Sequence, residues 1–386
     1  MDICVLNPYF YPQPGGTEHV LLDLYSRLAK EHNVTVVTSS LNRKDSEKTE
    51  YVGSIRVVRL HTKYHDVPGL PLPFLEMREL KEKIQEIGAD IYHLNNRYQY
   101  FSETVNTIRK TGRLVLTIHN ALPKGIDALT DSVGFLFDVV WGRKLMIQAD
   151  LITAVSKYTL DGTVPHNLHH KSVVIHNGVD YKRFMPRSKS SKEVSALRSS
   201  LGFDDHRVIL NCARLVTQKG QRYLIRAVSE LRKDKEYEDL KLAIIGKGPL
   251  KKKLHTEAKK MHMADSFRIF SDVEADRIPY FYNMADAFSM PSLYEPAGLS
   301  VMEAMASGTT SVVSRTGGIP EIAKDTVYYT KVKGVEQIKK RLAMILDDKK
   351  LSESMAKRGR LLVKKEHDWD TIAKQYEAEF EKILKR

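Results

Sequence analysis

The sequence contains little cysteine and no long apolar run. Its 386 residues include two cysteines, Cys4 and Cys212. Two thiols so far apart do not build a disulfide framework, which favours a reducing compartment, and both read as small buried hydrophobes. No stretch approaches the roughly 18 consecutive apolar residues of a membrane-spanning helix. Residues 1–6 read as a strand rather than as a signal peptide, so we expect a cytoplasmic protein.

Acidic side chains are outnumbered by basic ones. Lys and Arg total 61 and Asp and Glu total 48, a formal net charge of +13. Residues 1–186 carry 22 basic and 20 acidic side chains, and residues 187–386 carry 39 and 28, so the second half holds +11. Such an excess permits three kinds of partner: nucleic acid, an anionic membrane surface or a phosphorylated small molecule.

Short apolar strands alternate with helical periods through both halves, separated by the polar stretch 186–192, which reads as a linker or exposed loop. This alternation predicts two doubly wound domains with parallel sheets covered on both faces, and ligands at the carboxyl ends of their strands. The expected strands are 3–6, 34–38, 55–60, 91–94, 114–118, 151–155, 173–175, 208–213, 240–245, 267–271, 287–290 and 310–314, and the expected helices are 20–28, 223–232, 251–261, 301–306, 335–346, 351–364 and 370–384.

Two candidate ligand contacts follow strands of the first half. Gly15-Gly16 lies between a strand and a helix, where backbone N–H groups can approach a phosphate; a structural turn is the alternative, and the spacing fits neither a dinucleotide fingerprint nor a P-loop. His119 directly follows the strand 114–118 and can hydrogen-bond a ligand hydroxyl or phosphate, although most of the 14 histidines are expected to be structural or solvated.

A basic loop follows the first strand of the second half. Arg214 can supply a bidentate fork and Lys219 a point charge, and together they suit a diphosphate; a solvated basic loop is the alternative. Residues 246–249, Gly-Lys-Gly-Pro, read as a tight turn rather than a catalytic site, and their nearness to the expected cleft leaves a minor role open.

Residues 291–308 are the most informative stretch, because a strand runs into a loop and then a helix beginning near Gly298. Glu295 precedes that helix and Glu303 lies inside it. Both carboxylates can accept hydrogen bonds from vicinal hydroxyls of a sugar or ribose, or can be ordinary exposed helix charges. Glu303 has apolar neighbours in sequence, so it needs a partner.

Together these stretches resemble the family-four retaining glycosyltransferases, which have the GT-B fold. The resemblance implies two Rossmann-like domains facing across a cleft, residues 1–186 and 187–367, with a last helix at 368–386 that crosses back to the first domain. The matching pieces, in order along nearly the whole chain, are Gly15-Gly16-Thr17-Glu18, His119, Ala154-Val155-Ser156, Asn177-Gly178-Val179-Asp180, Arg214-Leu215, Lys219-Gly220, residues 246–249, Pro291-Ser292, Glu295 to Glu303, Ala304-Met305-Ala306 with Gly308, and Gly317-Gly318-Ile319-Pro320-Glu321.

The resemblance also implies a nucleotide-sugar donor held mainly by the second domain and a hydroxyl acceptor held by the first. It implies retention of the anomeric configuration and no cofactor or essential metal. The implied roles are diphosphate binding for Arg214 and Lys219, ribose binding for Glu303, a contact with the base near Val273, contacts with the transferred sugar for Glu295, Ala297, Gly298, Leu299 and Ser300, a phosphate contact for Gly15 and Gly16, and stabilisation of the transition state for His119.

Three departures from the family pattern affect the choice of sugar and acceptor. Asn120 follows His119 where Asp is common, Ala297 stands where Phe is frequent, and Thr310 replaces a common Pro. None removes a group assigned to donor binding.

Two apolar stretches of the first half, Pro68–Phe74 and Gly134–Met146, can dip into a bilayer surface and suit a lipid-linked acceptor, which gives a peripheral membrane hypothesis. Core packing and a rigid loop are the alternative.

Three other functions compete with the enzyme. A non-catalytic relative that binds nucleotide sugars or glycans is disfavoured by the intact Arg214, Lys219, Glu295 and Glu303. A nucleic-acid-binding protein is disfavoured because the chain contains no recognised nucleic-acid module. A nicotinamide-dependent oxidoreductase is disfavoured because the third glycine of its fingerprint is missing.

Overall fold

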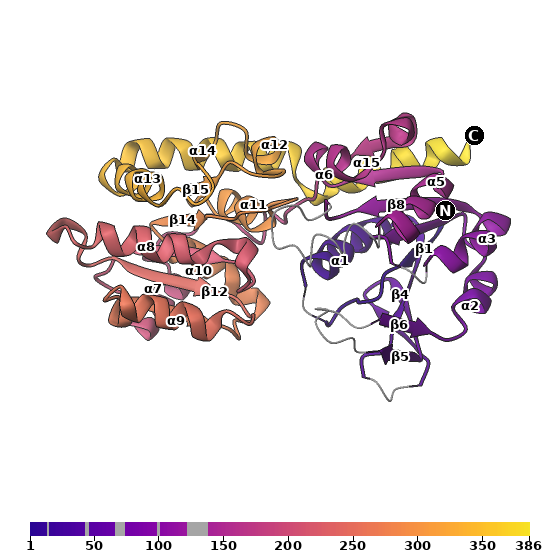
Figure 1. The fold of residues 1–386 in the computed structure, drawn as a ribbon, viewed down its shortest axis with the longest axis horizontal. Helices are drawn as coiled ribbons and strands as arrows, with labels where there is room; N and C mark the ends of the chain where they lie inside the picture. The colour runs from indigo at the N-terminus through magenta and orange to yellow at the C-terminus, as the bar shows by residue number, and fades with distance from the viewer. Residues whose placement is uncertain (14, 43–45, 66–73, 99–100, 122–137) are drawn as a thin grey trace. The chain divides into compact units, whose positions relative to one another are not determined.

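The computed structural model describes residues 1–13, 15–42, 46–65, 74–98, 101–121 and 138–386, and its chain forms two compact units (Figure 1). Unit 1 comprises Met1–Asn177 and Trp369–Arg386, and unit 2 comprises Gly178–Asp368. The first boundary thus falls before Gly178 rather than after residue 186. The reason is packing, since Val179 and Phe184 are buried in a core of unit 2.

Unit 1 is built on a mainly parallel sheet. Among its described residues, the strand order is β10-β9-β8-β7-β1-β2-β4-β3, and only β3 pairs antiparallel to its neighbour. A separate hairpin joins β5 to β6. The strands are β1 (Asp2–Leu6), β2 (Asn33–Ser39), β3 (Lys48–Val52), β4 (Ile55–Leu60), β5 (Thr62–His65), β6 (Phe74–Met77), β7 (Ile91–Asn95), β8 (Arg113–Ile118), β9 (Leu151–Ala154) and β10 (Ser172–Val174), and the α-helices are α1 (Gly16–Leu28), α2 (Leu80–Ile87), α3 (Phe101–Thr111), α5 (Arg143–Gln148), α6 (Lys157–Thr163) and α15 (Trp369–Leu384).

The strands expected in the first half are confirmed, and so is the helix over 20–28. Sequence periodicity missed β3 and the β5–β6 hairpin. In β3 the exposure pattern is largely solvent-facing, and its charged residues Lys48 and Glu50 leave no apolar run to signal a strand. Edge strands of this kind are recognised by their pairing rather than by burial.

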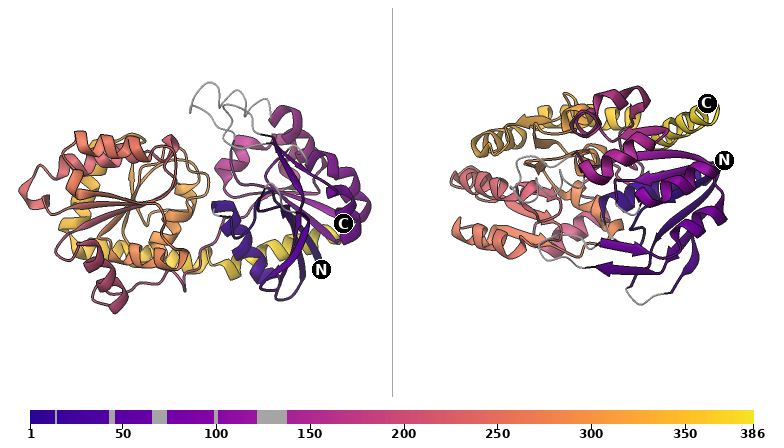
Figure 2. Two further views of the ribbon diagram at one scale, coloured as in Figure 1. Left: turned by 90° about the horizontal axis from the view of Figure 1, so that it is seen from below. Right: turned by 45° about the vertical axis from the view of Figure 1, so that its right-hand side comes forward.

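The last helix, α15, packs in unit 1, as the resemblance implied (Figure 2). Nε of Arg27 on α1 donates to Oδ1 of Asp370 at 3.0 Å, and Nε2 of His32 lies 2.8 Å from Oε1 of Glu377. Phe380, on the apolar side of α15, is fully buried. The chain passes between the units twice, after Asn177 and after Asp368. Next to these two points, within unit 2, Val179 N–H donates to the His367 carbonyl at 2.8 Å.

Unit 2 is built on an all-parallel sheet with the strand order β13-β12-β11-β14-β15-β16 among its described residues. Alternate residues of β11 enter different apolar cores, Leu210 one and Ile209 the other, so both faces of the sheet are covered. The elements are α7 (Lys192–Leu201), β11 (Val208–Cys212), α8 (Gln221–Leu231), β12 (Lys241–Ile245), α9 (Lys251–Lys260), β13 (Phe267–Phe270), α10 (Ile278–Met284), β14 (Ala287–Met290), α11 (Leu299–Ala306), β15 (Ser311–Ser314), α12 (Ile319–Ala323), β16 (Tyr328–Thr330), α13 (Val335–Asp347) and α14 (Lys349–Glu366).

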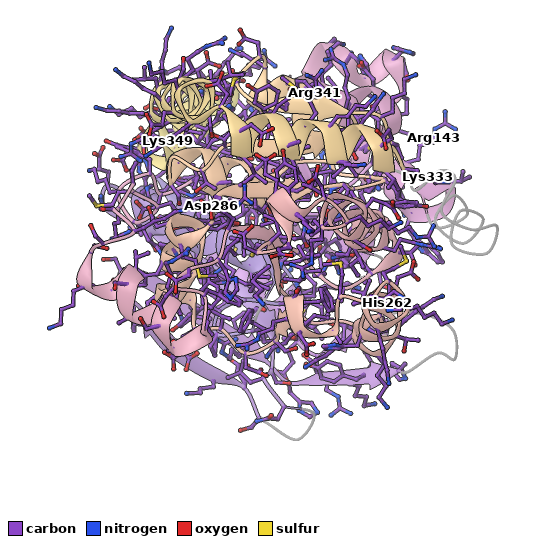
Figure 3. All side chains as sticks on the ribbon, turned by 90° about the vertical axis from the view of Figure 1, so that its left-hand side faces the viewer. Arg143, His262, Asp286, Lys333, Arg341 and Lys349 are labelled. Carbon is purple, nitrogen blue, oxygen red and sulfur yellow. The ribbon has the colours of Figure 1, made fainter. Side chains whose placement is uncertain are left out.

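The positive charge of unit 2 includes surface side chains on and near its C-terminal helices. Figure 3 labels Lys333 in the turn before α13, Arg341 on α13 and Lys349 at the start of α14, and Lys333 and Lys349 are exposed. None of the described helices combines the length and apolar character needed to cross a membrane. Much of Pro68–Phe74 and the start of Gly134–Met146 lie outside the described residues, so the bilayer hypothesis for these stretches stays a prediction.

Candidate functional site

The loops that follow β11 and β14 lie side by side in unit 2, because the two strands are adjacent and parallel. Leu293 N–H donates to the Gln218 carbonyl at 2.7 Å and joins the loops. Gly220 adopts a left-handed φ of 65°, and a Cβ there would overlap the carbonyl oxygen of Pro291. Glycine at this position therefore permits the close approach of the two loops.

Lys219 and Glu295 meet across these loops. Nζ of Lys219 donates to Oε2 of Glu295 at 2.6 Å, and Oε1 of Glu295 accepts from Gly298 N–H at 3.2 Å. The two side chains are 16% and 8% exposed, so water screens the pair weakly. An ammonium group has three N–H donors, and the carboxylate occupies one. Lys219 can therefore bind an anion while Glu295 holds it in place.

The first turn of α11 begins directly beside this ion pair. Gly298, at the N-cap, has a left-handed φ of 63°. The N–H groups of Leu299 and Ser300 belong to the first turn, where an α-helix leaves its N–H groups without intrahelical partners and carries partial positive charge. Gly318 N–H donates to the Glu295 carbonyl at 3.0 Å and fixes the loop from the side of β15.

Glu303 lies one turn further along α11 and has the partner that its apolar surroundings required. The buried phenol of Tyr282, on α10, donates to Oε2 of Glu303 at 2.7 Å. Burial first, and the charge of Glu303 after it, raise the pKa of Tyr282 well above its ordinary value. Burial and the charge of Glu303 raise the pKa of the Cys212 thiol to about 12, so it stays protonated. Tyr282 thus remains a hydrogen-bond donor to Glu303.

The remaining predicted residues of unit 2, apart from those on α11, lie in the loops after β11, β13 and β14. Arg214 is exposed, and its guanidinium pairs with no side chain in the part of the chain that the structure describes, while its carbonyl accepts from Nε2 of Gln221 at 2.8 Å. Val273 is half-buried against the same core as Leu299. Ala297 is buried. Among the predicted residues of unit 2, hydrogen bonds join Lys219, Glu295 and Gly298 directly.

Of the predicted residues of unit 1, His119 lies directly after a strand, and Gly15 and Gly16 lie at the start of a helix. His119 follows β8 and is 6% exposed, and its Nε2 lies 2.9 Å from Oδ1 of Asn95. Burial lowers the pKa of His119 to about 4, so its ring is neutral near pH 7. The helix α1 begins at Gly16, and Gly15 at its N-cap has an extended backbone that any residue can adopt.

Sequence reasoning missed Tyr282 and Asn95. Tyr282 is separated from Glu303 by 21 positions, and nothing local marks its hydroxyl as the partner of that carboxylate. The sequence could have pointed to Asn95, because it ends the apolar strand over 91–95. An amide at the carboxyl end of a parallel strand is a candidate ligand contact.

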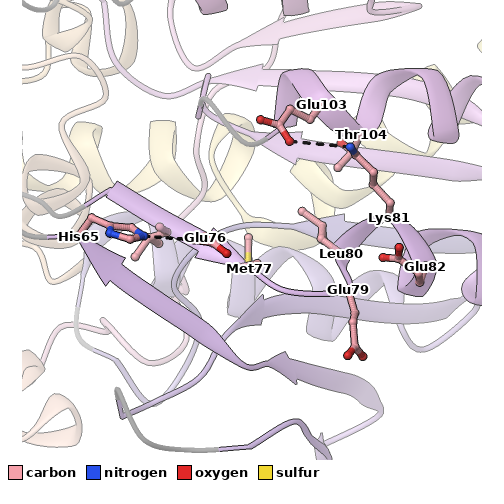
Figure 4. Close-up of a pocket in the computed structure, with 10 residues that line it drawn as sticks. His65, Glu76, Met77, Glu79, Leu80, Lys81, Glu82, Glu103 and Thr104 are labelled. Carbon is pink, nitrogen blue, oxygen red and sulfur yellow. Dashed lines mark hydrogen bonds and ion pairs between the residues drawn. The ribbon is translucent and has the colours of Figure 1, made fainter.

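A cavity of about 510 Å³ lies elsewhere, between the β5–β6 hairpin and the helices α2 and α3 of unit 1 (Figure 4). Its lining includes Nε2 of His65, which lies 3.3 Å from Oε2 of Glu76, and an ion pair of Lys81 with Glu103 at 3.8 Å. No predicted site residue lines it. Within the described ranges, no three His, Cys, Asp or Glu side chains gather as a metal site.

Comparison with solved structures identifies the architecture. Sucrose-phosphate synthase of Thermosynechococcus elongatus has a TM-score of 0.79 and 19% identity, covering 100% of this chain and 99% of that one. An Anabaena protein, HepE, solved in complex with UDP-glucose, has a TM-score of 0.74 and 19% identity over the same shares. The chain has the GT-B fold, and the fold prediction is confirmed.

The family follows from the sequence matches. Residues 14–183 match the family model described as Glycosyltransferase Family 4, and residues 194–362 match Glycosyl transferases group 1. The chain belongs to the glycosyltransferases that these two models describe.

Two curated relatives show how far this similarity extends. An uncharacterised glycosyltransferase of Methanocaldococcus jannaschii is 32% identical over 53% of this chain and 52% of its own length. A GDP-mannose-dependent alpha-(1-6)-phosphatidylinositol monomannoside mannosyltransferase of Mycolicibacterium smegmatis is 32% identical over 59% of this chain and 61% of its own length. The matches thus span about half to three fifths of these relatives.

Proposed function

We propose that the protein is a glycosyltransferase that moves a sugar from a nucleoside-diphosphate sugar to a hydroxyl acceptor. The observation that carries the proposal is the contact of Lys219, Glu295 and Gly298 where β11 and β14 end. It places an ammonium group, a carboxylate and a helix N-terminus together at the position where parallel sheets bind ligands. Membership of the family supports the same activity.

In the proposed reaction, the bond between the anomeric carbon and the diphosphate oxygen breaks, and a bond from that carbon to the acceptor oxygen forms. The nucleoside diphosphate leaves with the bonding electron pair, and the acceptor hydroxyl gives up its proton to the departing phosphate oxygen. Arg214 and Lys219 stabilise the charge that grows on the diphosphate. Glu303, held by Tyr282, binds the ribose hydroxyls.

Transfer without a metal ion is the finer part of the proposal. The leaving diphosphate needs positive charge, which Mg²⁺ supplies in many phosphoryl-transfer enzymes. The exposed guanidinium of Arg214, the ammonium of Lys219 and the first turn of α11 can supply it here.

Retention of the anomeric configuration is proposed to occur by attack of the acceptor on the face that the leaving group departs from, through an oxocarbenium-like state. Glu295 is poorly suited to be a covalent nucleophile, because its two oxygens accept from Lys219 and from Gly298 N–H. Its proposed role is to orient the transferred sugar together with Ala297 and the first turn of α11. His119 is proposed to contact the same sugar, and Gly15 and Gly16 a phosphate.

The base, the sugar and the acceptor are proposed here as chemical classes. The Mycolicibacterium relative is named for GDP-mannose and a phosphatidylinositol mannoside. The HepE structure holds UDP-glucose. We therefore propose a GDP- or UDP-sugar donor, base contacts near Val273, and a glycan or lipid-linked acceptor reached from the cytoplasm, with peripheral binding to an anionic membrane.

A thermal-shift panel of UDP, GDP, ADP and their sugars tests donor binding. A ligand that binds only the folded protein stabilises it by about 2.7 kcal/mol at one hundred times its dissociation constant. We expect one nucleotide series to raise Tm, and that rise to shrink in Lys219→Ala. Binding without sugar transfer to any acceptor would favour the non-catalytic alternative, and no shift with any nucleotide would overturn the proposal.

A further inference from the structure

His119 is held by two consecutive asparagines at the end of β7. Its ring nitrogen Nε2 lies 2.9 Å from Oδ1 of Asn95, and its backbone N–H donates to Oδ1 of Asn96 at 3.2 Å. Asn96 has a left-handed φ of 67°, which asparagine tolerates better than most residues, and its N–H donates to the Thr117 carbonyl at 2.9 Å. The ring and the backbone of His119 are therefore both fixed from the neighbouring strand.

The orientation of the Asn95 amide follows from its contact with His93. Nδ2 donates to the His93 carbonyl at 3.4 Å. With the amide reversed, Oδ1 would face the His93 carbonyl, oxygen against oxygen. The oxygen of Asn95 therefore faces the ring of His119.

The surroundings of Asn95 are closed to water. The phenol of Tyr25 is hydrogen-bonded to Nδ1 of His93, the residue whose carbonyl accepts from Asn95. Tyr25 and His93 are fully buried and Asn95 is 1% exposed, so water does not replace these partners. Asn95 therefore keeps the His93 carbonyl and the ring of His119 as its partners.

We propose that Asn95 is a positioning residue that fixes His119 in the Nε2–H tautomer and leaves Nδ1 as a hydrogen-bond acceptor. An amide oxygen only accepts, so the hydrogen between the two side chains resides on Nε2. Nδ1 has no hydrogen-bond partner among the described residues. An acceptor nitrogen attracts a hydroxyl hydrogen and repels a phosphate oxygen.

This tautomer determines what His119 can recognise. The ligand group at Nδ1 is a hydroxyl, and a hydroxyl of the transferred sugar fits, whereas the diphosphate does not. This consequence rests on the proposed function, and the tautomer itself does not. It also means that His119 orients a hydroxyl and does not deliver a proton as a general acid.

Nitrogen-15 NMR of the histidine-labelled wild-type protein at pH 7 tests the tautomer without an activity assay. His119 is assigned by the signals that disappear in His119→Gln. We expect a protonated Nε2 and an unprotonated Nδ1. A protonated Nδ1 in the folded wild-type protein would overturn the proposal, whatever the protein catalyses.

Three variants separate positioning from folding. Asn95→Leu removes the acceptor and should give a mixture of tautomers, with kcat lowered roughly ten- to a hundredfold and the donor KM nearly unchanged. Asn95→Asp restores an acceptor and the Nε2–H signal. Tyr92→Phe removes a buried hydroxyl from the same strand, where it donates to the Ile84 carbonyl, and should leave the His119 signals and kcat as in the wild type.

The outcomes distinguish the two proposals. An unchanged tautomer in Asn95→Leu would overturn the role of Asn95. A protein with the expected tautomer and no transferase activity would overturn the proposed function and leave the inference standing.

Discussion

At the level of single residues, the site of unit 2 is organised by one carboxylate. Glu295 accepts from the Lys219 ammonium with one oxygen and from Gly298 N–H with the other. Both side chains are largely buried, so the pair is held in one geometry before any ligand arrives. A preorganised charge stabilises a transition state without reorganising during the reaction. Lys219 and Glu295 are therefore expected to affect turnover more than stability.

Lys219→Ala and Glu295→Ala should each lower kcat by about 10²-fold or more, because each removes a preorganised charge. Steady-state kinetics with the donor identified by thermal shift measures the loss. Lys233→Ala is the matched control, since Lys233 pairs with Glu230 on the exposed surface of the same domain. Wild-type turnover in both site variants would refute the assignment.

Two buried histidines should make the stability of unit 1 sensitive to acid. Burial lowers the pKa of His93 to about 3 and that of His119 to about 4, against about 6.5 for an unfolded histidine. Between pH 6.5 and 4 the unfolded chain binds more protons, so the free energy of unfolding falls as pH falls. Inside that window each group contributes about 1.4 kcal/mol per pH unit.

Urea unfolding followed by tryptophan fluorescence at pH 7, 6 and 5 measures this effect, because both tryptophans, Trp141 and Trp369, lie in unit 1. His93→Gln should flatten the pH dependence. His170→Gln, at an exposed histidine, should leave it unchanged. Equal slopes in the wild type and His93→Gln would contradict the assignment of a neutral buried His93.

At the level of helices and strands, apolar runs and turn residues predicted most strands of both sheets but neither β3 nor β16, and the family resemblance implied that the last helix packs with unit 1. Periodicity could not find β3, whose stability comes from pairing with β4 rather than from burial. Candidate site residues could be predicted where a charged side chain lies in the loop that follows a strand, as Lys219 and Glu295 do. It was not predictable where a partner comes from a distant element, as Tyr282 does for Glu303.

Glycines set the approach of the loops that carry the site, and this can be tested. Gly220 and Gly317 both have left-handed φ values, and a Cβ would overlap the carbonyl of Pro291 in one case and of Glu295 in the other. Gly220→Ala and Gly317→Ala should separate the loops, weaken nucleotide binding at least tenfold and lower kcat. Gly202 provides the control, since its φ is 66° and a Cβ there meets nothing within 4 Å.

Gly202→Ala should therefore cost only the backbone strain, about 1 kcal/mol of stability, and leave nucleotide affinity unchanged. Isothermal titration calorimetry with the nucleotide chosen by thermal shift measures all three variants. An equal loss of affinity in Gly202→Ala would show that backbone strain alone, and not the approach of the loops, explains the effect.

For the whole molecule, the structure shows where part of the net positive charge lies. The second half carries +11, and unit 2 holds the Lys219 ammonium beside the first turn of α11 and the exposed Arg214 in the loop after β11. Two side chains do not account for the excess, and Lys333 and Lys349 illustrate the part that is exposed to solvent on other elements. The excess charge therefore does not by itself require nucleic acid as a partner.

If Arg214, Lys219 and the helix N-terminus neutralise the leaving diphosphate, the enzyme should not need a divalent cation. Turnover of the protein incubated with EDTA and then assayed in metal-free buffer should remain within about twofold of the untreated value, since these groups supply the charge that a metal would. In Lys219→Ala, added Mg²⁺ should restore part of the lost turnover, because a cation can replace the missing charge. Loss of activity with EDTA in the wild type, reversed by Mg²⁺, would show that a metal ion completes the site.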